Sequence, residues 1–476
     1  MEEIEVLNLD DDIKKDNKKV VKEENIDIKK EEKRVIEEPS KNKDEKKEKK
    51  RLRKSEKIFL LINILIIFGI IAFYGYRTIH FYKLTHQEAE NLTLKDKLTA
   101  LTNIAYQNDG LYEKTGYFYY KGSLVNNYVT YSGRLFRIID ISDKGIRMID
   151  NETSTNIVWS IDKNYQESII KGWLDDYFKT LKDPDVYLVK NNWCNEKIDA
   201  KDYKCNVTIE DYIGLLSTED YLQAGGKNSY LNNETYYWTI NQDMDGKALY
   251  INKEGGINNI ISNEDNYYSY GIRPVITLSN EVSIINGDGS INNPFVIENL
   301  GNAMLRENGV GSYVKYNNQD FRILKVEDDG ILLIYDGVLE VEKNFNDTIK
   351  YLNNDYLKDF KKEDLVKINY TIGEYNLGNK YSYKSENSKG TNYVTIPKIG
   401  DMFLNDFGNY WLNNISDKKL GLYYTIDENK MFFGDLSGNK HQIRPVIKVN
   451  IEMVVSGGIG TSVDPLIVGD NDVEEN

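Results

Sequence analysis

The chain has 476 residues, 40% hydrophobic and 29% charged, with 76 acidic and 61 basic side chains and a formal net charge of −15. This length exceeds that of one ordinary domain, and the polar composition excludes a transporter with many membrane spans. Two cysteines exclude a disulfide-dense scaffold and a multi-cysteine zinc module. The acidic balance argues against a protein that binds nucleic acid through phosphate contacts, so no nucleic-acid partner is predicted.

Residues 1–57 consist mainly of Lys, Glu, Asp, Asn and Ile. The last part of this segment, Lys41 to Lys57, carries ten basic and four acidic residues. Such a segment cannot bury enough apolar surface to offset the entropy lost on ordering it. The composition predicts a disordered cytoplasmic tail and leaves open whether the tail has a cytoplasmic partner.

Residues 58–76 read IFLLINILIIFGIIAFYGY, nineteen residues without a charge. As a helix this stretch is long enough to cross a hydrocarbon core of about 30 Å, and it lacks the polar face that a helix of a soluble domain shows. A cleaved signal peptide is disfavoured because the charged lead is too long and no small-x-small site follows the apolar run. The sequence therefore predicts one transmembrane helix, a signal-anchor that makes the membrane a partner.

Basic residues set the predicted orientation. Residues 41–57 hold ten Lys and Arg, whereas the equal stretch 77–93 holds only Arg77 and Lys83. The positive-inside rule then places the amino terminus in the cytoplasm and residues 77–476 outside the cell. The predicted localisation is the cell membrane, with an extracellular part that makes up most of the chain.

Residues 77–110 are predicted to form a helical stalk beside the membrane. Between Leu84 and Ala105 the sequence contains no Pro or Gly, and apolar residues recur at helical spacing. These residues are Leu94, Leu98, Leu101 and Ile104.

Beyond residue 110 the sequence contains an internal repeat. The segment Gly271 to Ile297 aligns without gaps on Gln442 to Val468, and nine of the 27 positions are identical. Upstream, Phe-Arg-Ile and Tyr-Trp motifs recur in the same order in both copies. Self-similarity of this kind indicates two copies of one domain. The predicted boundaries are 111–300 for the first domain and 301–470 for the second, followed by an acidic tail over 471–476.

Each copy shows short alternating apolar runs split by Asn, Gly, Asp and Ser, the pattern of half-buried antiparallel strands and their turns. Hairpin turns are predicted at Asp143-Lys144-Gly145 and at Asp328-Asp329-Gly330. Helical stretches are predicted over residues 166–181 and after Ser217, where Ser217 and Asp220 have the spacing of an N-capping box. Because strands and helices are interspersed without a regular βαβ rhythm, the predicted fold class is α+β.

The order of a Phe-Arg-Ile hairpin, a Tyr-Trp strand and a Gly-Ile-Arg-Pro-Val strand resembles a family of uncharacterised extracellular bacterial domains. The resemblance covers residues 111–298 and 302–469. It implies two tandem domains similar to the C-type-lectin-like and sulfatase-modifying-factor folds. Its signature residues here are Trp238, Arg273 and Pro274 in the first copy and Trp411, Arg444 and Pro445 in the second. The second copy departs from the pattern, because Gln442 replaces the Gly before Ile-Arg-Pro.

These signature residues have a structural and a functional interpretation. An Arg in an apolar strand must be paired, so Arg273 and Arg444 are interpreted as structural residues that bind carboxylates or loop carbonyls. Trp238 and Trp411 are interpreted as core residues rather than as platforms for a ligand.

Cys194 and Cys205 lie in a polar stretch of the part predicted to be extracellular. We predict a disulfide that closes this short loop, with reduced thiols as the alternative. Neither cysteine has a companion for a metal site, and no cofactor is predicted.

The segment Asn241-Gln-Asp243-Met-Asp245-Gly246 imitates the start of a calcium loop. Asn241, Asp243 and Asp245 are the candidate calcium ligands. The twelfth position is Asn252 rather than Glu, and strands are expected on both sides, which favours a hairpin turn. The prediction is that no metal binds.

No nucleophile elbow, HExxH motif or P-loop is present. The copper-binding cysteines of a formylglycine-generating enzyme are not matched, so that activity is rejected. The prediction is a non-catalytic bacterial surface protein whose tandem domains bind or scaffold an extracellular glycan or protein. Two alternatives stay open: an envelope hydrolase that uses an unrecognised carboxylate pair, and an envelope-assembly factor whose charged tail docks a cytoplasmic partner.

Overall fold

The computed structural model of the chain describes residues 92–100, 103–159, 164–199, 203–260, 268–374, 385–404, 409–415, 421–425, 430–434 and 436–469. The tail predicted over 1–57, the span over 58–76 and the acidic tail over 471–476 lie outside these residues. Within the described ranges, no helix is both long enough and apolar enough to cross a membrane. The predicted single-pass topology, the membrane as partner and the extracellular localisation are therefore corrected, since the described structure gives them no support.

The prediction of an α+β fold is also wrong, because the described residues are mostly β-sheet. The α-helices are short segments that join strands and do not form a layer of their own. The helix predicted over 166–181, for example, spans only ten residues. The α-helices are α3 (Leu94–Leu98), α4 (Ile169–Phe178), α5 (Pro184–Tyr187), α6 (Thr218–Gln223) and α7 (Phe345–Asn354). The 3-10 turns are η2 (Gly226–Asn228), η3 (Leu305–Glu307), η4 (Tyr356–Asp359) and η5 (Lys362–Asp364).

Of the stalk helix predicted between Leu84 and Ala105, the structure describes residues 92–100 and 103–105, and only α3 (Leu94–Leu98) is α-helical among them. The hydroxyl of Thr93 accepts a hydrogen bond from the amide of Asp96 at 3.1 Å and caps this turn. Leu94 and Leu98 are buried, and the amide of Leu94 donates to the carbonyl of Val282 at 2.8 Å. This helix thus packs into the core of the first half.

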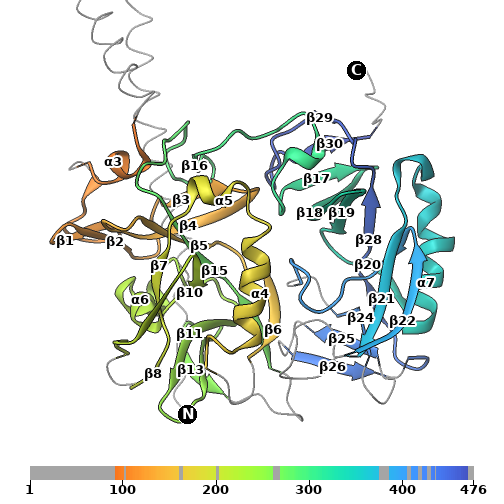
Figure 1. Cartoon of the computed structure of the whole chain (residues 1–476), viewed down its shortest axis with the longest axis horizontal. Helices are drawn as coiled ribbons and strands as arrows, with labels where there is room; N and C mark the ends of the chain where they lie inside the picture. The colour runs from red at the N-terminus through yellow and green to blue at the C-terminus, as the bar shows by residue number, and fades with distance from the viewer. Residues whose placement is uncertain are drawn as a thin grey trace, which may run out of the picture. The chain divides into compact units, whose positions relative to one another are not determined.

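The first half of the described chain (residues 92–298) is built on two main sheets (Figure 1). The first sheet runs in the order β1 (Gly110–Lys114), β2 (Tyr117–Lys121), β4 (Arg134–Ile141), β5 (Ile146–Asp150), β15 (Pro274–Leu278) and β10 (Ile213–Leu215), with β3 (Tyr128–Tyr131) on β4 and β16 (Phe295–Val296) on β3. The second runs in the order β13 (Ile257–Ile260), β12 (Ala248–Ile251), β11 (Tyr237–Asp243), β14 (Ser269–Ile272) and β6 (Thr155–Val158), with β8 (Lys197–Ile198) on β11. A separate pair joins β7 (Asn191–Cys194) to β9 (Thr208–Asp211).

The second half (residues 299–469) again has two sheets, drawn in teal to blue in Figure 1. The first runs in the order β23 (Val394–Thr395), β28 (Val446–Val449), β19 (Gly330–Tyr335), β18 (Gln319–Glu327), β17 (Tyr313–Tyr316), β30 (Leu466–Val468) and β29 (Val455–Gly457). The second runs in the order β20 (Leu339–Lys343), β27 (His441–Ile443), β24 (Tyr410–Ile415), β21 (Ile368–Glu374) and β22 (Ser385–Asn392), with β25 (Gly421–Thr425) on β24 and β26 (Lys430–Gly434) on β25.

Corresponding strands of the two halves pair in corresponding ways. The Phe-Arg-Ile hairpin places Phe136 opposite Asp150 in the first half and Phe321 opposite Tyr335 in the second. The Tyr-Trp strand runs parallel to the strand before Arg-Pro in both halves, through β11 with β14 and β24 with β27. The sequence repeat is thus a repeat of strand topology as well.

The halves contact each other through residues 398–404, the connection between β23 and β24. Ile399, Met402, Phe403 and Leu404 are buried. Three carbonyls of this connection accept hydrogen bonds from side chains of the first half, each at 2.7 Å: Gly400 from Trp173, Asp401 from Thr155, and Leu404 from Asn156. An ion pair joins Arg322 of the second half to Glu152 of the first at 2.9 Å. Buried contacts of this number indicate that the halves behave as one rigid unit.

The corresponding connection of the first half runs between β10 and β11 and contains α6. It contacts the end of the β1–β2 hairpin rather than the other half. In each half an aromatic residue of this connection covers the arginine of the Phe-Arg-Ile motif: Tyr230 lies over Arg137 and Phe403 over Arg322. The amide of Phe403 donates to the carbonyl of Ser154 in the first half at 2.5 Å. The amide of Tyr230 donates instead to the carbonyl of Gly122, directly after β2, at 2.8 Å.

Candidate functional site

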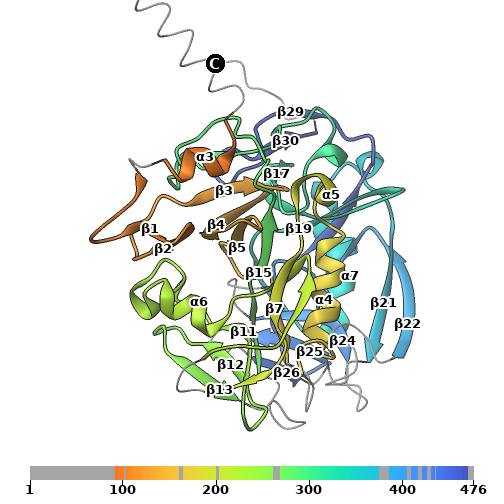
Figure 2. The same ribbon diagram turned by 60° about the vertical axis from the view of Figure 1, so that its left-hand side comes forward.

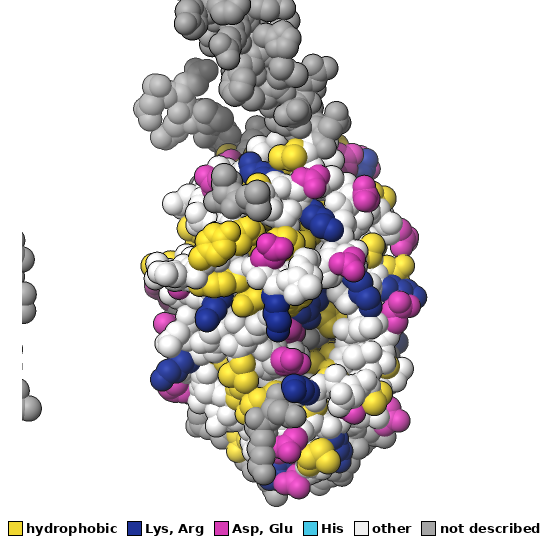
Figure 3. All heavy atoms as spheres, turned by 90° about the vertical axis from the view of Figure 1, so that its left-hand side faces the viewer, with side chains coloured by type: hydrophobic (Ala, Val, Ile, Leu, Met, Phe, Trp, Pro, Cys, Tyr) yellow, Lys and Arg dark blue, Asp and Glu magenta, His cyan; other side chains and the backbone are white. Residues whose placement is uncertain are grey.

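A groove of about 670 Å³ lies between the β1–β2 hairpin and α6. Figure 2 brings both elements forward, and Figure 3 shows this side of the molecule, where hydrophobic patches alternate with charged side chains. The groove is lined by Lys114, Tyr117, Tyr119, Glu219, Asp220, Leu222 and Gln223.

The hairpin presents two different faces because its residues alternate between the core and the groove. Leu111 lies opposite Tyr120, and both are buried. Tyr112 lies opposite Tyr119, and both are half-buried on the other face. The two-residue turn between the strands, Thr115 and Gly116, has positive φ angles of 55° and 79°, as a type I′ hairpin turn requires.

Three tyrosines form a strip on this face of the hairpin, and two of them, Tyr117 and Tyr119, line the groove. The ring centroids of Tyr112 and Tyr119 are 5.7 Å apart, those of Tyr119 and Tyr117 are 6.0 Å apart, and the planes of each pair lie within 25° of parallel. The hydroxyl of Tyr112 donates to the carbonyl of Asn108, and that of Tyr117 donates to Asp140 at 3.2 Å. Two of the three rings are therefore held in place before any ligand arrives.

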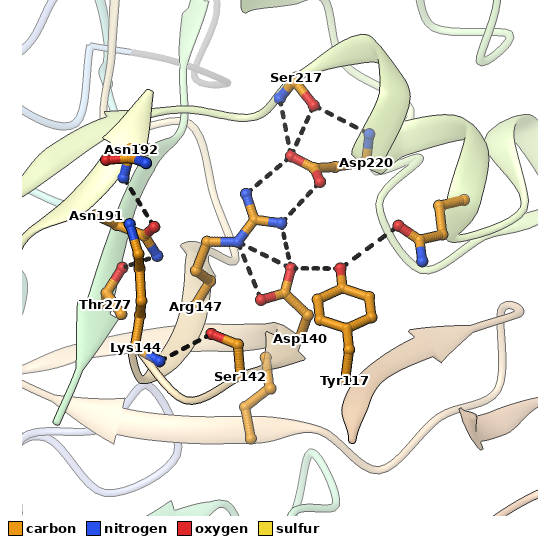
Figure 4. Close-up of polar contacts among 12 residues, drawn as sticks. Tyr117, Asp140, Ser142, Lys144, Arg147, Asn191, Asn192, Ser217, Asp220 and Thr277 are labelled. Atoms are coloured by element: carbon orange, nitrogen blue, oxygen red, sulfur yellow. Dashed lines mark hydrogen bonds and ion pairs between the residues drawn. The ribbon is translucent and has the colours of Figure 1, made fainter. Parts of the chain in front are cut away.

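Asp220, which lines the groove, belongs to an ionic network centred on Arg147 of β5 (Figure 4). Its Nε donates to both carboxylate oxygens of Asp140 on β4, at 2.8 and 3.0 Å, and its Nη2 also contacts Asp140. Its Nη1 and Nη2 donate to the carboxylate of Asp220 on α6 at 3.0 and 2.7 Å. One guanidinium thereby joins the sheet to the helix that forms the opposite wall.

Asp220 also belongs to the capping box of α6, which confirms the prediction made from its spacing. Its amide donates to the hydroxyl of Ser217 at 3.0 Å, and this hydroxyl donates to the carboxylate of Asp220 at 2.7 Å. The same carboxylate therefore starts the helix and anchors it to Arg147.

Burial and charge act in opposite senses on these groups. Burial raises the pKa of Asp140, against the attraction of Arg147. Burial also acts to raise the pKa of Asp220, but the charge of Arg147 and its hydrogen bonds outweigh it and leave the pKa lowered. Burial and the nearby Asp140 raise the pKa of the Tyr117 phenol, which therefore stays a neutral donor.

This arrangement disfavours the carboxylate pair of a hydrolase at the groove. A glycosidase needs one carboxyl that protonates and a second that attacks or activates water. Asp140 and Asp220 are both bound to Arg147, and Asp140 is 1% exposed. Glu219 is the remaining carboxylate among the residues that line the groove.

The two predicted arginines are buried and bind backbone carbonyls at equivalent positions. The Nε of Arg273 donates to the carbonyl of Asp150, and the Nε of Arg444 donates to that of Tyr335, both at 3.0 Å. A second donor of Arg273 reaches Leu231 at 2.8 Å, and that of Arg444 reaches Phe403. These bonds tie the Arg-Pro strand to the β10–β11 and β23–β24 connections, which is a structural role.

Trp238 and Trp411 lie in the core at 1% and 0% exposure. Their indole N–H groups donate to the carbonyls of Ile157 at 2.9 Å and Lys343 at 2.8 Å. The two prolines also have structural contacts. Pro274 pairs with Leu215 of the neighbouring strand, and the carbonyl of Pro445 accepts a hydrogen bond from the amide of Tyr335. The structure brings none of these six residues to the groove.

The candidate calcium ligands lie in and next to the β11–β12 turn. The side-chain oxygen of Asn241 accepts from the amide of Thr218 at 2.8 Å. The carboxylate of Asp243 accepts from the amide of Lys247 and the side chain of Asn259, at 2.9 and 2.6 Å. Asn241 thus contacts the start of α6, Asp243 holds the turn, and Asp245 lies 3.7 Å from the ammonium of Lys247. No group of three metal-ligating side chains is found in the described ranges.

Cys194 and Cys205 form the predicted disulfide, with their Cα atoms 5.8 Å apart. It closes the loop that joins β7 to β9. The side-chain amide of Asn241 donates to the sulfur of Cys194 at 3.3 Å, so the closed loop also contacts the Tyr-Trp strand.

Comparison of the chain with protein families, with curated proteins and with solved structures finds no match. The resemblance to uncharacterised bacterial domains stays a prediction.

Proposed function

We propose that this chain is a non-catalytic binding protein whose ligand occupies the groove between the β1–β2 hairpin and α6. The observation that carries the proposal is the composition of the groove: half-buried tyrosines of the hairpin lie beside two aspartates that are already neutralised in part by Arg147. Aromatic side chains in an open groove can bind a ligand. Carboxylates that are already bound to an arginine are poorly suited to act as a general acid or base.

The second half supports this role as a scaffold. Its connection over residues 398–404, which corresponds to the α6 connection, is buried against the first half. The corresponding connection of the first half contains α6, which lines the groove, and its Leu222 is 48% exposed. One copy of the repeat therefore presents a binding surface while the other fixes the unit.

The proposal is tested by incubating the full chain with a panel of immobilised polysaccharides and peptides and analysing both the bound protein and the panel members. We expect the protein to retain at least one member and to leave it chemically unchanged. Replacing Leu222 with Asp should abolish retention, because it places a charge in the apolar part of the groove. The matched control is Val186→Asp, at a residue 72% exposed outside the groove lining, which should bind as the unmodified protein does.

Two results would contradict the proposal. Release of hydrolysis products would show catalysis, and equal retention by the Leu222→Asp variant would place the ligand elsewhere.

A further inference from the structure

We infer that the ligand of the groove is an uncharged oligosaccharide, which stacks on the strip formed by Tyr112, Tyr119 and Tyr117. This inference rests on the proposed function and names the chemical class that the groove fits. Three features support it: the pre-set aromatic strip, the balance of charge and the polar groups on the opposite wall.

The strip matches the apolar side of a sugar ring. A pyranose has a face of C–H groups, which packs on an aromatic surface, and a rim of hydroxyls. The ring centroids of neighbouring tyrosines are 5.7 and 6.0 Å apart, which places the three rings in one row, and two of them, Tyr117 and Tyr119, line the groove. Because hydrogen bonds already hold the rings of Tyr112 and Tyr117, little side-chain entropy is lost on binding.

The charges of the groove lining and of the residues next to it cancel, which favours a neutral ligand. Lys114 lines the groove, and the ammonium of Lys121 lies 5.7 Å from the ring centroid of Tyr112. Against these two positive charges stand Glu219 and the single net negative charge of the network of two aspartates and Arg147. The chain as a whole carries −15, which opposes binding of a polyanion.

The wall formed by α6 supplies polar partners for hydroxyl groups. Glu219 offers a carboxylate and Gln223 an amide, and both line the groove with Leu222 as its one aliphatic member. A peptide held by its side chains would need deeper apolar pockets, and a peptide added as a strand would pair at the edge of β1 rather than above its face. Several hydrogen-bonding groups beside a flat aromatic strip suit a polyhydroxylated ligand better.

The test is isothermal titration calorimetry of the full chain with three neutral probes, cellohexaose, maltohexaose and chitohexaose, and with two competitors of other chemistry, hexagalacturonate and decaproline. Titrations are repeated with Tyr119→Ala, with Tyr119→Phe, and with Tyr106→Ala as a matched control. Tyr106 is 84% exposed and does not line the groove.

We expect at least one neutral hexasaccharide to bind. Tyr119→Ala should weaken its affinity by about tenfold or more, because the stacking surface is lost. Tyr119→Phe keeps the ring and should change the affinity by less than about threefold, and Tyr106→Ala should leave it unchanged.

The inference is overturned if none of the neutral probes binds, or if Tyr119→Ala binds them as tightly as the unmodified chain. Binding of decaproline or hexagalacturonate alone, lost in Tyr119→Ala, also overturns it while leaving the proposed binding function intact. Cleavage of any probe would overturn the proposed function itself.

Discussion

Asp140 and Asp220 bind different edges of one guanidinium: Asp140 takes the Nε–Nη2 edge of Arg147, and Asp220 takes the Nη1–Nη2 edge. One aspartate belongs to β4 and the other to α6, so the position of the helix wall depends on a charge of the sheet. The shape of the groove is therefore tied to this network.

Replacing Arg147 with Met should lower the free energy of unfolding by about 3 kcal/mol, because two largely buried carboxylates lose their shared partner. The measurement is urea denaturation followed by circular dichroism. Lys179→Met is the matched control: its ion pair with Asp176 is exposed at both ends, and we expect a much smaller change in the free energy of unfolding. A loss for Arg147→Met no larger than that of the control would show that the network does not hold α6 in place.

Replacing Phe403 with Ala should lower the free energy of unfolding by about 3–4 kcal/mol. Its buried ring covers Arg322, and Arg322 forms the ion pair with Glu152 that joins the second half to the first. Scanning calorimetry should show one transition for the unmodified chain and two for the variant, since the halves lose part of their shared core. Met244→Ala, at a residue 65% exposed in the β11–β12 turn, should keep the single transition. Two transitions already present in the unmodified chain would contradict a single rigid unit.

His441 should make stability depend on pH. Burial lowers its pKa from the ordinary value, against a smaller opposing effect of Glu342. The unfolded chain then binds more protons than the folded chain just below about pH 6.5, so stability is full above this pH and falls as the pH drops toward the folded pKa. His441→Phe should reduce the loss of stability between about pH 6.5 and pH 5, measured by urea denaturation at each pH. His86→Gln is the control, and an unchanged slope in His441→Phe would refute the assignment.

Removal of the disulfide in the double variant Cys194→Ser and Cys205→Ser should cost about 2–3 kcal/mol, as expected for the short loop that it closes. Thermal unfolding with and without a reductant measures this cost. The reductant should destabilise the unmodified chain and have no effect on the double variant. An equal response of both proteins would show that the effect of the reductant does not come from this bond.

Local patterns predicted the elements whose causes are local. The spacing of Ser217 and Asp220 predicted a capping box, and the two Asp-rich turns predicted the hairpins β4–β5 and β18–β19. The fold class was predicted wrongly because the helical periodicity after residue 166 is real but short, and it marks the ten-residue connector α4 rather than a layer.

The groove could not be predicted in this way. The alternation of Tyr117 and Tyr119 with buried neighbours is readable in the sequence, but their position opposite α6 depends on contacts between distant segments. Asp140, Arg147 and Asp220 come from three elements, and nothing in the spacing of these residues shows that they meet. The predicted signature residues are those that both copies share, whereas the groove belongs to the first copy alone.

The hydrogen bond between Tyr230 and Gly122 keeps within the first half a contact that the second half makes across the boundary between the halves. In the second half, the equivalent aromatic amide binds Ser154 of the half that precedes it. In the first half, the β1–β2 hairpin supplies this acceptor from its own end. The hairpin therefore provides, within the first half, the acceptor that the second half finds in its neighbour. One backbone donor of the repeat is thus satisfied in two ways, once across the boundary between the halves and once within a half beside the groove.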